Sequence, residues 1–401
     1  MFSPNCRDYM CNSATLREKK DQAELPKLKL CQYICREKNY CYLCIVLKHL
    51  TVGQKRTSLK DIAQRLGVSI ATVSRALHGS PEIGQEMQLK VQTLAKELNY
   101  RPNPFAQSLR KAAPKMIGVV VPNLVTHYYA SVLDGIEAEA TKAGYSVISA
   151  NSHESHEAEA RIVDNFNSLH VEGIIACLAQ DTITYDHFEE IRRMGIPLVF
   201  FGRTCLTDTF STVTANGDEA AQQATQHLID TGSRRIAFIG GPQHLDMVKR
   251  RKHGYIEALH ENRLPIDRSL VVCDRIDYDI ALQNTLRLLQ RSDRPDAILA
   301  FNDIITFAAF TAIKQLGLSI PHDVALIGFT DDLHACYVTP QLSAIVDQSA
   351  LMGQRACQLL LRHIGGDSHV YREIVPQQLV IRQSSDKKPL PQPLSQGEGS
   401  V

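Results

Sequence analysis

The chain has 401 residues, which is enough for more than one domain, and its 44% hydrophobic and 22% charged content is typical of a globular protein. No apolar run approaches the roughly 18–20 residues of a membrane-spanning helix, and the N-terminus lacks the pattern of a secretory signal. We therefore expect a cytoplasmic protein without a membrane segment. The net charge of +1 conceals an uneven distribution, because ten basic and only four acidic residues lie between Lys55 and Lys111.

The first 54 residues carry no periodic pattern of helices or strands, although six of the eleven cysteines lie there. Four thiolates can bind zinc, and such a set is present at Cys31, Cys35, Cys41 and Cys44. The intervals between these cysteines are very short for a zinc site, so we predict no metal site and no cofactor. We expect residues 1–54 to be a disordered extension, or sequence upstream of the native start.

Residues 58–78 predict two short helices around a Gly-Val-Ser turn. Ile62, Ala63 and Leu66 form an apolar stripe on the first helix, from about 59 to 66. Gly67 can adopt the left-handed conformation that ends a helix, and Ser69 is placed to cap the start of the second helix. An ordinary helical hairpin has the same periodicity, but the local basic charge favours a helix-turn-helix that binds DNA.

The second helix of this pair has one apolar and one polar or small-residue face. Val73 and Leu77 point inward, and the outward positions are Ile70, Ala71, Thr72, Ser74 and Arg75. A third helix is expected from about Ile83 to Leu98. A narrow helix with small outward side chains fits the major groove of DNA, so we expect this helix to read base edges.

From Met116 onward, Val/Ile-rich runs alternate with amphipathic helical segments. The runs form two series: MIGVVV, YSVISA, GIIACL and PLVFFG, then RIAFIGG, LVVCD, AILAFND and VALIGFTD. Continuous apolar runs separated by helices predict parallel sheets that are covered on both faces. We therefore expect an α/β domain of two doubly wound parallel-sheet subdomains after an all-α N-terminal module. Ligands of such sheets bind beyond the carboxyl ends of the strands.

Several motifs together resemble the lactose-repressor (LacI) family of transcription regulators. GVSIATVSRAL and NYRPNPFAQSLR are followed, in the family's order and spacing, by RKHGY, AFND and GFTDD. The resemblance implies a headpiece at 55–102, a hinge helix and linker at 103–114 and an effector-binding and dimerisation domain at 115–385 that resembles periplasmic sugar-binding proteins. Its three crossovers between subdomains are expected near Asn216, Asp347 and Gln377, and 386–401 is expected to be a disordered tail.

The resemblance also implies roles in DNA binding. Ile70 and Ala71 occupy base-reading positions, where apolar side chains suit thymine methyl groups, and Arg75 is expected to donate to a guanine. The residues expected to contact phosphates or support the fit are Ser69, Thr72, Ser74 and His78. In the hinge helix, Leu109 is expected to wedge into the minor groove with Ala106 on the same face; a plain linker remains the alternative there.

Effector-binding roles follow from the same resemblance. Arg251 is expected to grip ligand hydroxyls or a carboxylate, Asn302 to supply a donor and an acceptor, and Tyr128 or Tyr129 to stack on an apolar ligand face. Many family members have Asp where this chain has Thr330, so the effector could be acidic or its recognition rearranged. A carbohydrate or carbohydrate derivative is the expected effector.

Motifs of nucleotide-binding loops or nucleophilic catalysis are absent from the sequence, and no catalytic residue is predicted. His153 and His156 lie near Glu154 and Glu157 and superficially suggest a metal site, but a solvated loop and helix start is the preferred interpretation. We expect a homodimeric repressor that reads a pseudo-palindromic double-stranded operator under small-molecule control. The alternatives are a stand-alone sugar sensor and an enzyme on a doubly wound fold.

Overall fold

The computed structural model describes residues 57–98, 100, 115–330 and 334–387. The chain divides into two compact units, one ending at Asn103 and the other beginning at Pro104. The predicted N-terminal extension, the predicted hinge with Ala106 and Leu109, and the tail beyond Lys387 lie outside the described residues. Among the described residues, no helix combines the length and the apolar character that crossing a bilayer requires.

The described part of the first unit is a three-helix module, as the sequence predicts. Its helices are α3 (Leu59–Leu66), α4 (Ile70–Leu77) and α5 (Gln85–Glu97). Their apolar stripes meet in one small core, in which Ile62, Val73, Ala76 and Val91 are fully buried. The core fixes the angle between α3 and α4, and the outer face of α4 remains exposed.

The second unit begins with a six-stranded parallel sheet. Its strands are β1 (Met116–Val121), β2 (Ser146–Asn151), β3 (Gly173–Ala176), β4 (Leu198–Phe201), β5 (Ser211–Ala215) and β11 (Arg372–Val375), in the order β11-β5-β4-β3-β1-β2. Every residue of β1, β3 and β4 is buried. Burial on both faces explains why these strands read as continuous apolar runs.

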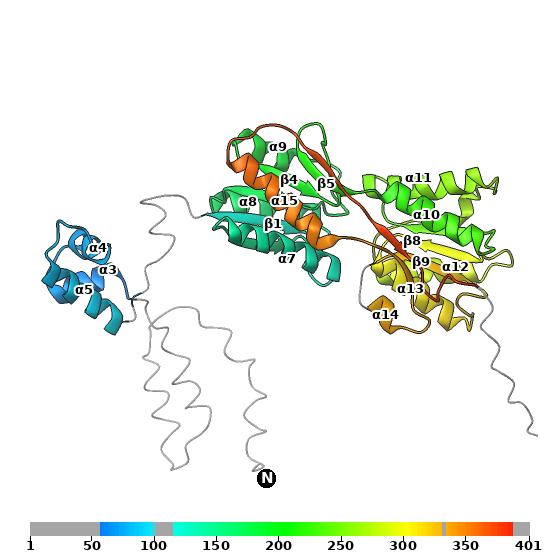
Figure 1. Cartoon of the computed structure of the whole chain (residues 1–401), viewed down its shortest axis with the longest axis horizontal. Helices are drawn as coiled ribbons and strands as arrows, with labels where there is room; N and C mark the ends of the chain where they lie inside the picture. Colours follow the sequence, from blue (N-terminus) through cyan, green and yellow to red (C-terminus); the bar gives the residue numbers. More distant parts are fainter. Residues whose placement is uncertain (1–56, 99, 101–114, 331–333, 388–401) are drawn as a thin grey trace, which may run out of the picture. The chain divides into compact units, whose positions relative to one another are not determined.

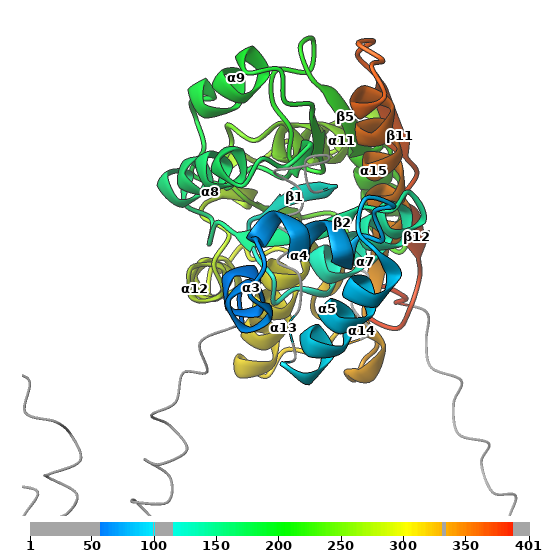
Figure 2. The same ribbon diagram turned by 90° about the vertical axis from the view of Figure 1, so that its left-hand side faces the viewer.

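Helices cover both faces of this sheet (Figure 2). Ile117 and Val119 of β1 pack in the cluster that contains α7 (His127–Lys142) and α15 (Ser349–Ile364). Val120 points to the opposite face and packs with α8 (His156–Ser168) and α9 (Asp186–Arg193). Side chains alternate along a strand, so one apolar run supplies both cores.

A second sheet repeats this order. Its strands are β6 (Ile236–Gly240), β7 (Val271–Cys273), β8 (Ala297–Ala300), β9 (Ala325–Phe329), β10 (Ser343–Val346) and β12 (Gln378–Val380), in the order β12-β10-β9-β8-β6-β7. Only the β10–β12 pair is antiparallel among these pairs. The helices of this half are α10 (Gly217–Asp230), α11 (Asp246–Glu261), α12 (Tyr278–Leu289), α13 (Asp303–Gln315) and the short α14 (His334–Tyr337), with a 3₁₀ turn at Arg268–Leu270.

The chain passes between the two sheets three times. It crosses at Asn216 after β5, between β10 and α15 at Asp347, and between β11 and β12 at Gln377; the last passage is the red segment in Figure 1. The crossings are hydrogen-bonded to one another, because Gln377 donates from its backbone N to Oδ1 of Asn216 at 2.7 Å and from Nε2 to Oδ1 of Asp347 at 2.6 Å. The three connections therefore form one joint.

Two helices that are distant in sequence approach closely at glycines. A Cβ on Gly135 of α7 would lie 2.1 Å from the carbonyl oxygen of Ala350, and one on Gly353 of α15 would lie 2.0 Å from that of Val132. A side chain at either position would push the helices apart. This packing brings Met352 of α15 against the hydroxyl of Tyr128, which donates to its Sδ at 3.0 Å.

Candidate nucleic-acid interface and ligand cleft

Side-chain caps fix the turn between α3 and α4. Ser58 and Asp61 form a reciprocal capping box at the start of α3, and Gly67 ends this helix at φ 65°. Oγ of Ser69 then accepts from the backbone N of Thr72 at 3.0 Å, as the sequence predicts for an N-cap. These local hydrogen bonds set the direction in which α4 leaves the turn, and the shared core of the three helices holds it there.

The outer face of α4 carries most of the predicted DNA-reading side chains. Ile70 is 48% exposed, Ala71 is also exposed, and Thr72 is half-buried next to Ser69. His78 is exposed at the end of the helix, where its Nδ1 lies 2.6 Å from the carbonyl oxygen of Ser74. Ile70 thus offers an apolar surface on this face of α4 that contact with a partner would bury.

The expectation that Ser74 faces outward is wrong. Ser74 is only 7% exposed. It lies beside Val73 and near Ala76, which are also buried, one turn before Leu77 and His78. Ser74 is therefore placed to support α4 rather than to contact a phosphate directly.

Arg75 projects into solvent and forms an ion pair with Glu82, with Nη1 3.1 Å from Oε2. The two side chains are 58% and 68% exposed, so solvent screens the pair and its net strength is small. Glu82 lies beyond α4, in the turn before α5. The guanidinium can exchange this partner for a base edge or a phosphate at little cost.

The second unit has a cleft at the carboxyl ends of its strands. Aromatic, apolar and charged side chains line this cleft together, as they do in small-molecule sites. Its walls come from the segments that follow β1, β2, β3 and β4 in one half and β6, β7, β8, β9 and β10 in the other. All five predicted effector-binding residues line it, namely Tyr128, Tyr129, Arg251, Asn302 and Thr330.

Arg251 lies deep in the cleft wall and is 4% exposed. Its guanidinium carbon lies 3.7 Å from the ring centroid of Phe329 and 4.8 Å from that of Phe301, and Nη1 donates to the carbonyl oxygen of Phe301. Burial lowers the pKa of Arg251 to about 10, against the opposing effect of Asp347. Its Nε has no hydrogen-bond partner among the described residues. An unused donor on a buried guanidinium favours binding of an oxygen acceptor.

The other predicted residues occupy distinct places. Tyr128 and Tyr129 pack edge to face at a centroid distance of 5.0 Å; Tyr129 is 7% exposed, and burial raises the pKa of its hydroxyl. Asn302 caps α13, because its Oδ1 accepts from the backbone N of Ile305 at 3.0 Å, which leaves its NH₂ group as the donor that can face a ligand. Thr330 is 3% exposed and follows β9 directly.

The sequence reasoning missed an ion pair in the cleft, between Arg203 and Glu154. Nη1 of Arg203 lies 2.6 Å from Oε2 of Glu154, which also accepts from the backbone N of Gln180 at 2.7 Å. Burial by itself lowers the pKa of Arg203, but Tyr129 and Glu154 outweigh it and raise the pKa overall. The interpretation of residues 153–157 as a solvated segment is wrong for Glu154, whose side chain is 16% exposed.

Four further polar residues of the cleft were not singled out for it: Asn123, Thr126, Asp303 and Asp347. Asp347 was identified only as a crossover position, and it follows β10 as Arg203 follows β4. Their position directly after buried strands is a signal that sequence reasoning could have used. Glu154 gave no such signal, because it lies in a polar stretch among other charged residues.

Two family descriptions match separate parts of the chain. Residues 58–103 match "Bacterial regulatory proteins, lacI family", and residues 225–385 match "Periplasmic binding protein-like domain". The first range contains α3, α4 and α5, and the second contains most of the second subdomain and the last crossings.

Full-length relatives share both parts. Catabolite control protein A of Priestia megaterium is 31% identical over 332 residues, which cover 82% of this chain and 99% of that protein. The ribose operon repressor of Bacillus subtilis (strain 168) is 31% identical over 76% of this chain and 90% of its own length. The HTH-type transcriptional repressor PurR of Actinobacillus pleuropneumoniae serotype 3 (strain JL03) is 28% identical over 82% of this chain and 98% of its own length.

Solved structures agree with this relationship. The lac repressor dimer bound to operator and the anti-inducer ONPF has a TM-score of 0.69 and 25% identity, covering 82% of this chain and 99% of that one. The complex of the transcriptional regulator CelR with cellobiose has a TM-score of 0.62 and 28% identity, covering 82% and 100%. With a helix-turn-helix and two parallel-sheet subdomains around a polar cleft, the chain belongs to the LacI family of DNA-binding transcription regulators.

Proposed function

We propose that the protein is a homodimeric, cytoplasmic repressor whose affinity for DNA is controlled by a carbohydrate bound in the cleft. We also propose that it is not an enzyme. The observation that supports control by a small-molecule effector is the convergence of four side chains on one cleft: Tyr128, Arg251, Asn302 and Thr330. These residues come from separate strands and helices, and their shared position is what a ligand site requires.

The chemistry of the cleft favours a polyhydroxylated ligand. Carboxylates at Glu154 and Asp347 accept hydrogen bonds, and the guanidiniums of Arg203 and Arg251 donate them. A sugar hydroxyl does both, so it can bridge such groups, and the half-buried face of Tyr128 suits the apolar face of a sugar ring. Relatives of the chain point the same way, since they include a ribose operon repressor and a regulator solved in complex with cellobiose.

On DNA, α4 is proposed to enter the major groove. Ile70 and Ala71 would contact thymine methyl groups and Arg75 a guanine, with Ser69 and Thr72 at the phosphates. The related lac repressor was solved as a dimer on its operator, and we propose the same arrangement here. Leu109, outside the described residues, is proposed as the wedge at the centre of the site, with Ala106 beside it.

The cleft and DNA binding are proposed to be coupled through the joint at the three crossings. A ligand that contacts both halves prefers one relative orientation of the subdomains and therefore shifts the population toward it.

A screen of monosaccharides, disaccharides and unrelated metabolites by thermal shift tests the proposal, followed by titration of each hit into protein bound to a duplex selected from a random pool. A carbohydrate that stabilises the protein and changes its DNA affinity supports the proposal. Stabilisation without any change in DNA affinity would indicate a stand-alone sensor, and turnover of the ligand would indicate an enzyme.

A further inference from the structure

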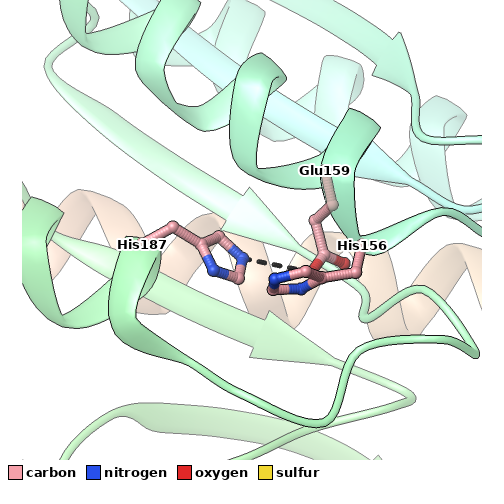
Figure 3. Close-up of side chains that lie close together, drawn as sticks. All are labelled: His156, Glu159 and His187. Atoms are coloured by element: carbon pink, nitrogen blue, oxygen red, sulfur yellow. Dashed lines mark hydrogen bonds and ion pairs between the residues drawn. The ribbon is translucent and has the colours of Figure 1, made fainter.

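A second polar cluster lies outside the residues that line the cleft. His156 begins α8, Glu159 lies one turn later on the same helix, and His187 lies in α9. Figure 3 shows the three side chains converging on one another. One potential ligand atom from each residue lies within 4.8 Å of the other two. Residues 31 positions apart in the sequence thus form one constellation of two imidazoles and a carboxylate.

The carboxylate of this cluster is fully buried. Oε2 of Glu159 accepts from the backbone N of Ala179 at 2.6 Å, and Oε1 accepts from the hydroxyl of Thr182 at 2.7 Å. Nε2 of His187 lies 3.1 Å from Oε1, and the side chain of His187 is 11% exposed. A buried carboxylate is costly and needs compensation. The outer hydrogen bonds from Ala179 and Thr182 fix its orientation, as the outer partners of a metal-binding carboxylate do.

His156 adds an imidazole with one unpaired nitrogen among the described residues. Its Nδ1 is buried and has no hydrogen-bond partner among the described residues. Its ring packs edge to face against that of His187 at a centroid distance of 5.1 Å. A buried nitrogen without a partner is rare in proteins, and beside a second imidazole and a buried carboxylate it is a free ligand position.

We propose that His156, Glu159 and His187 bind a divalent transition-metal ion of the zinc class. Two histidines and one glutamate form a ligand set of open zinc sites, with water in the fourth position. Ligand atoms around tetrahedral zinc lie roughly 3.3 to 3.5 Å apart. Nε2 of His187 and Oε1 of Glu159 are already 3.1 Å apart, so only the atoms nearer the 4.8 Å limit must move closer on binding. Rotation of the two imidazoles supplies this movement, and His187 exchanges its contact with Glu159 for the metal.

The position of the site gives the ion a structural consequence. The segment that holds Glu159 through Ala179 and Thr182 also carries Gln180 and Asp181, which contact the second subdomain. Metal binding therefore clamps α8, α9 and this segment together beside the cleft. This inference stands independently of the identity of the effector.

Cobalt(II) titration of the full chain tests the proposal. Cobalt bound by nitrogen and oxygen ligands gives visible d–d absorption, whereas thiolates add near-ultraviolet charge-transfer bands, so cysteine binding is distinguished in the same spectrum. We expect visible absorption that zinc abolishes by competition. His156→Phe, which keeps an aromatic ring against His187, should remove this absorption and raise the Kd for zinc by at least the roughly 10–100-fold that loss of an outer partner costs.

Two further variants make the test decisive. His187→Gln keeps an N–H donor for Glu159 and should also lose the absorption, with an unchanged circular dichroism spectrum as the check on folding. The matched control is His153→Asn, because His153 is exposed in the same segment at φ 51°, a conformation that Asn tolerates. Absorption in the control equal to that of wild type is expected. Wild-type protein without the d–d bands, or bands that persist in folded His156→Phe, would overturn the proposal.

Discussion

Arg275 and Asp181 form a two-pronged ion pair that joins the two subdomains, with Nη1 and Nη2 of the arginine 2.6 and 3.2 Å from the two carboxylate oxygens. Asp181 follows β3 in the first half, and Arg275 follows β7 in the second. Next to this pair, the backbone N of Ile276 donates to Oε1 of Gln180 at 2.7 Å. The halves are thus linked by side chains as well as by the three crossings of the chain.

Arg275→Ala should weaken effector binding modestly. The pair is about half exposed and contributes roughly 0.2–1 kcal/mol, so the effector Kd should rise by no more than about fivefold. Isothermal titration calorimetry with a ligand from the carbohydrate screen measures the change. Arg291→Ala is the control, because Arg291 pairs with Asp293 inside the second subdomain, and it should leave the Kd unchanged. An equal effect of both variants would show that this ion pair has no specific part in effector binding.

Arg251→Ala should abolish the response to the effector while operator binding persists. Loss of hydrogen bonds from a charged group costs about 1.5–3 kcal/mol each, so effector affinity should fall at least about tenfold. Fluorescence anisotropy of a labelled operator with and without effector reads both properties. Arg250, the neighbour on α11, pairs instead with Asp218. The Arg250→Ala protein should therefore keep the normal response of DNA binding to the effector. A normal response of Arg251→Ala would exclude Arg251 from the ligand site.

Arg75→Ala should lower affinity for the specific site by about 1–3 kcal/mol and relax the preference at one base position per half-site. Binding to unrelated duplexes should change far less. Glu82→Gln is the matched comparison, since it removes the ion-pair partner of Arg75 and should preserve or slightly strengthen binding. Competition assays at one fixed salt concentration measure both variants. An equal loss of affinity for all DNA sequences would instead indicate that Arg75 contacts a phosphate.

Gly353→Ala should destabilise the second unit by about 1–3 kcal/mol, because the added carbon would lie 2.0 Å from the carbonyl oxygen of Val132 and force α7 and α15 apart. Chemical denaturation gives the free energy of unfolding. Gly365 follows the end of the same helix, and a carbon added there would come no closer than 3.2 Å to a neighbouring atom, so Gly365→Ala is the matched control. This control should change stability little; a loss equal to that of Gly353→Ala would contradict the close-packing argument.

Local rules predicted the headpiece and the sheets well. The caps at Gly67 and Ser69 depend only on neighbours in the sequence. The Val/Ile-rich runs predict buried strands, because a strand that is buried on both faces consists of apolar residues. Ser74 was placed incorrectly because the edge of a buried helix face depends on how adjacent turns pack. Arg251 and Asn302 were found through family motifs, not through physics alone, and the structure places both in the cleft.

Long-range contacts were beyond sequence reasoning. Glu154 and Arg203 lie 49 positions apart, and no local pattern links them. The same holds for His156 and His187, which α8 and α9 bring together from separate connections. Charged residues in polar stretches look solvated in a sequence, and only the packing of the sheets' carboxyl ends shows which of them are buried.

Selection of binding sites from a random duplex pool by the full chain, at one stated salt concentration, shows whether α4 reads DNA. We predict enrichment of a pseudo-palindrome whose half-sites lie about one helical turn apart, with an affinity that the cleft ligand changes. Failure to enrich any sequence, both with and without carbohydrate ligands, would contradict a ligand-controlled repressor that reads DNA through α4.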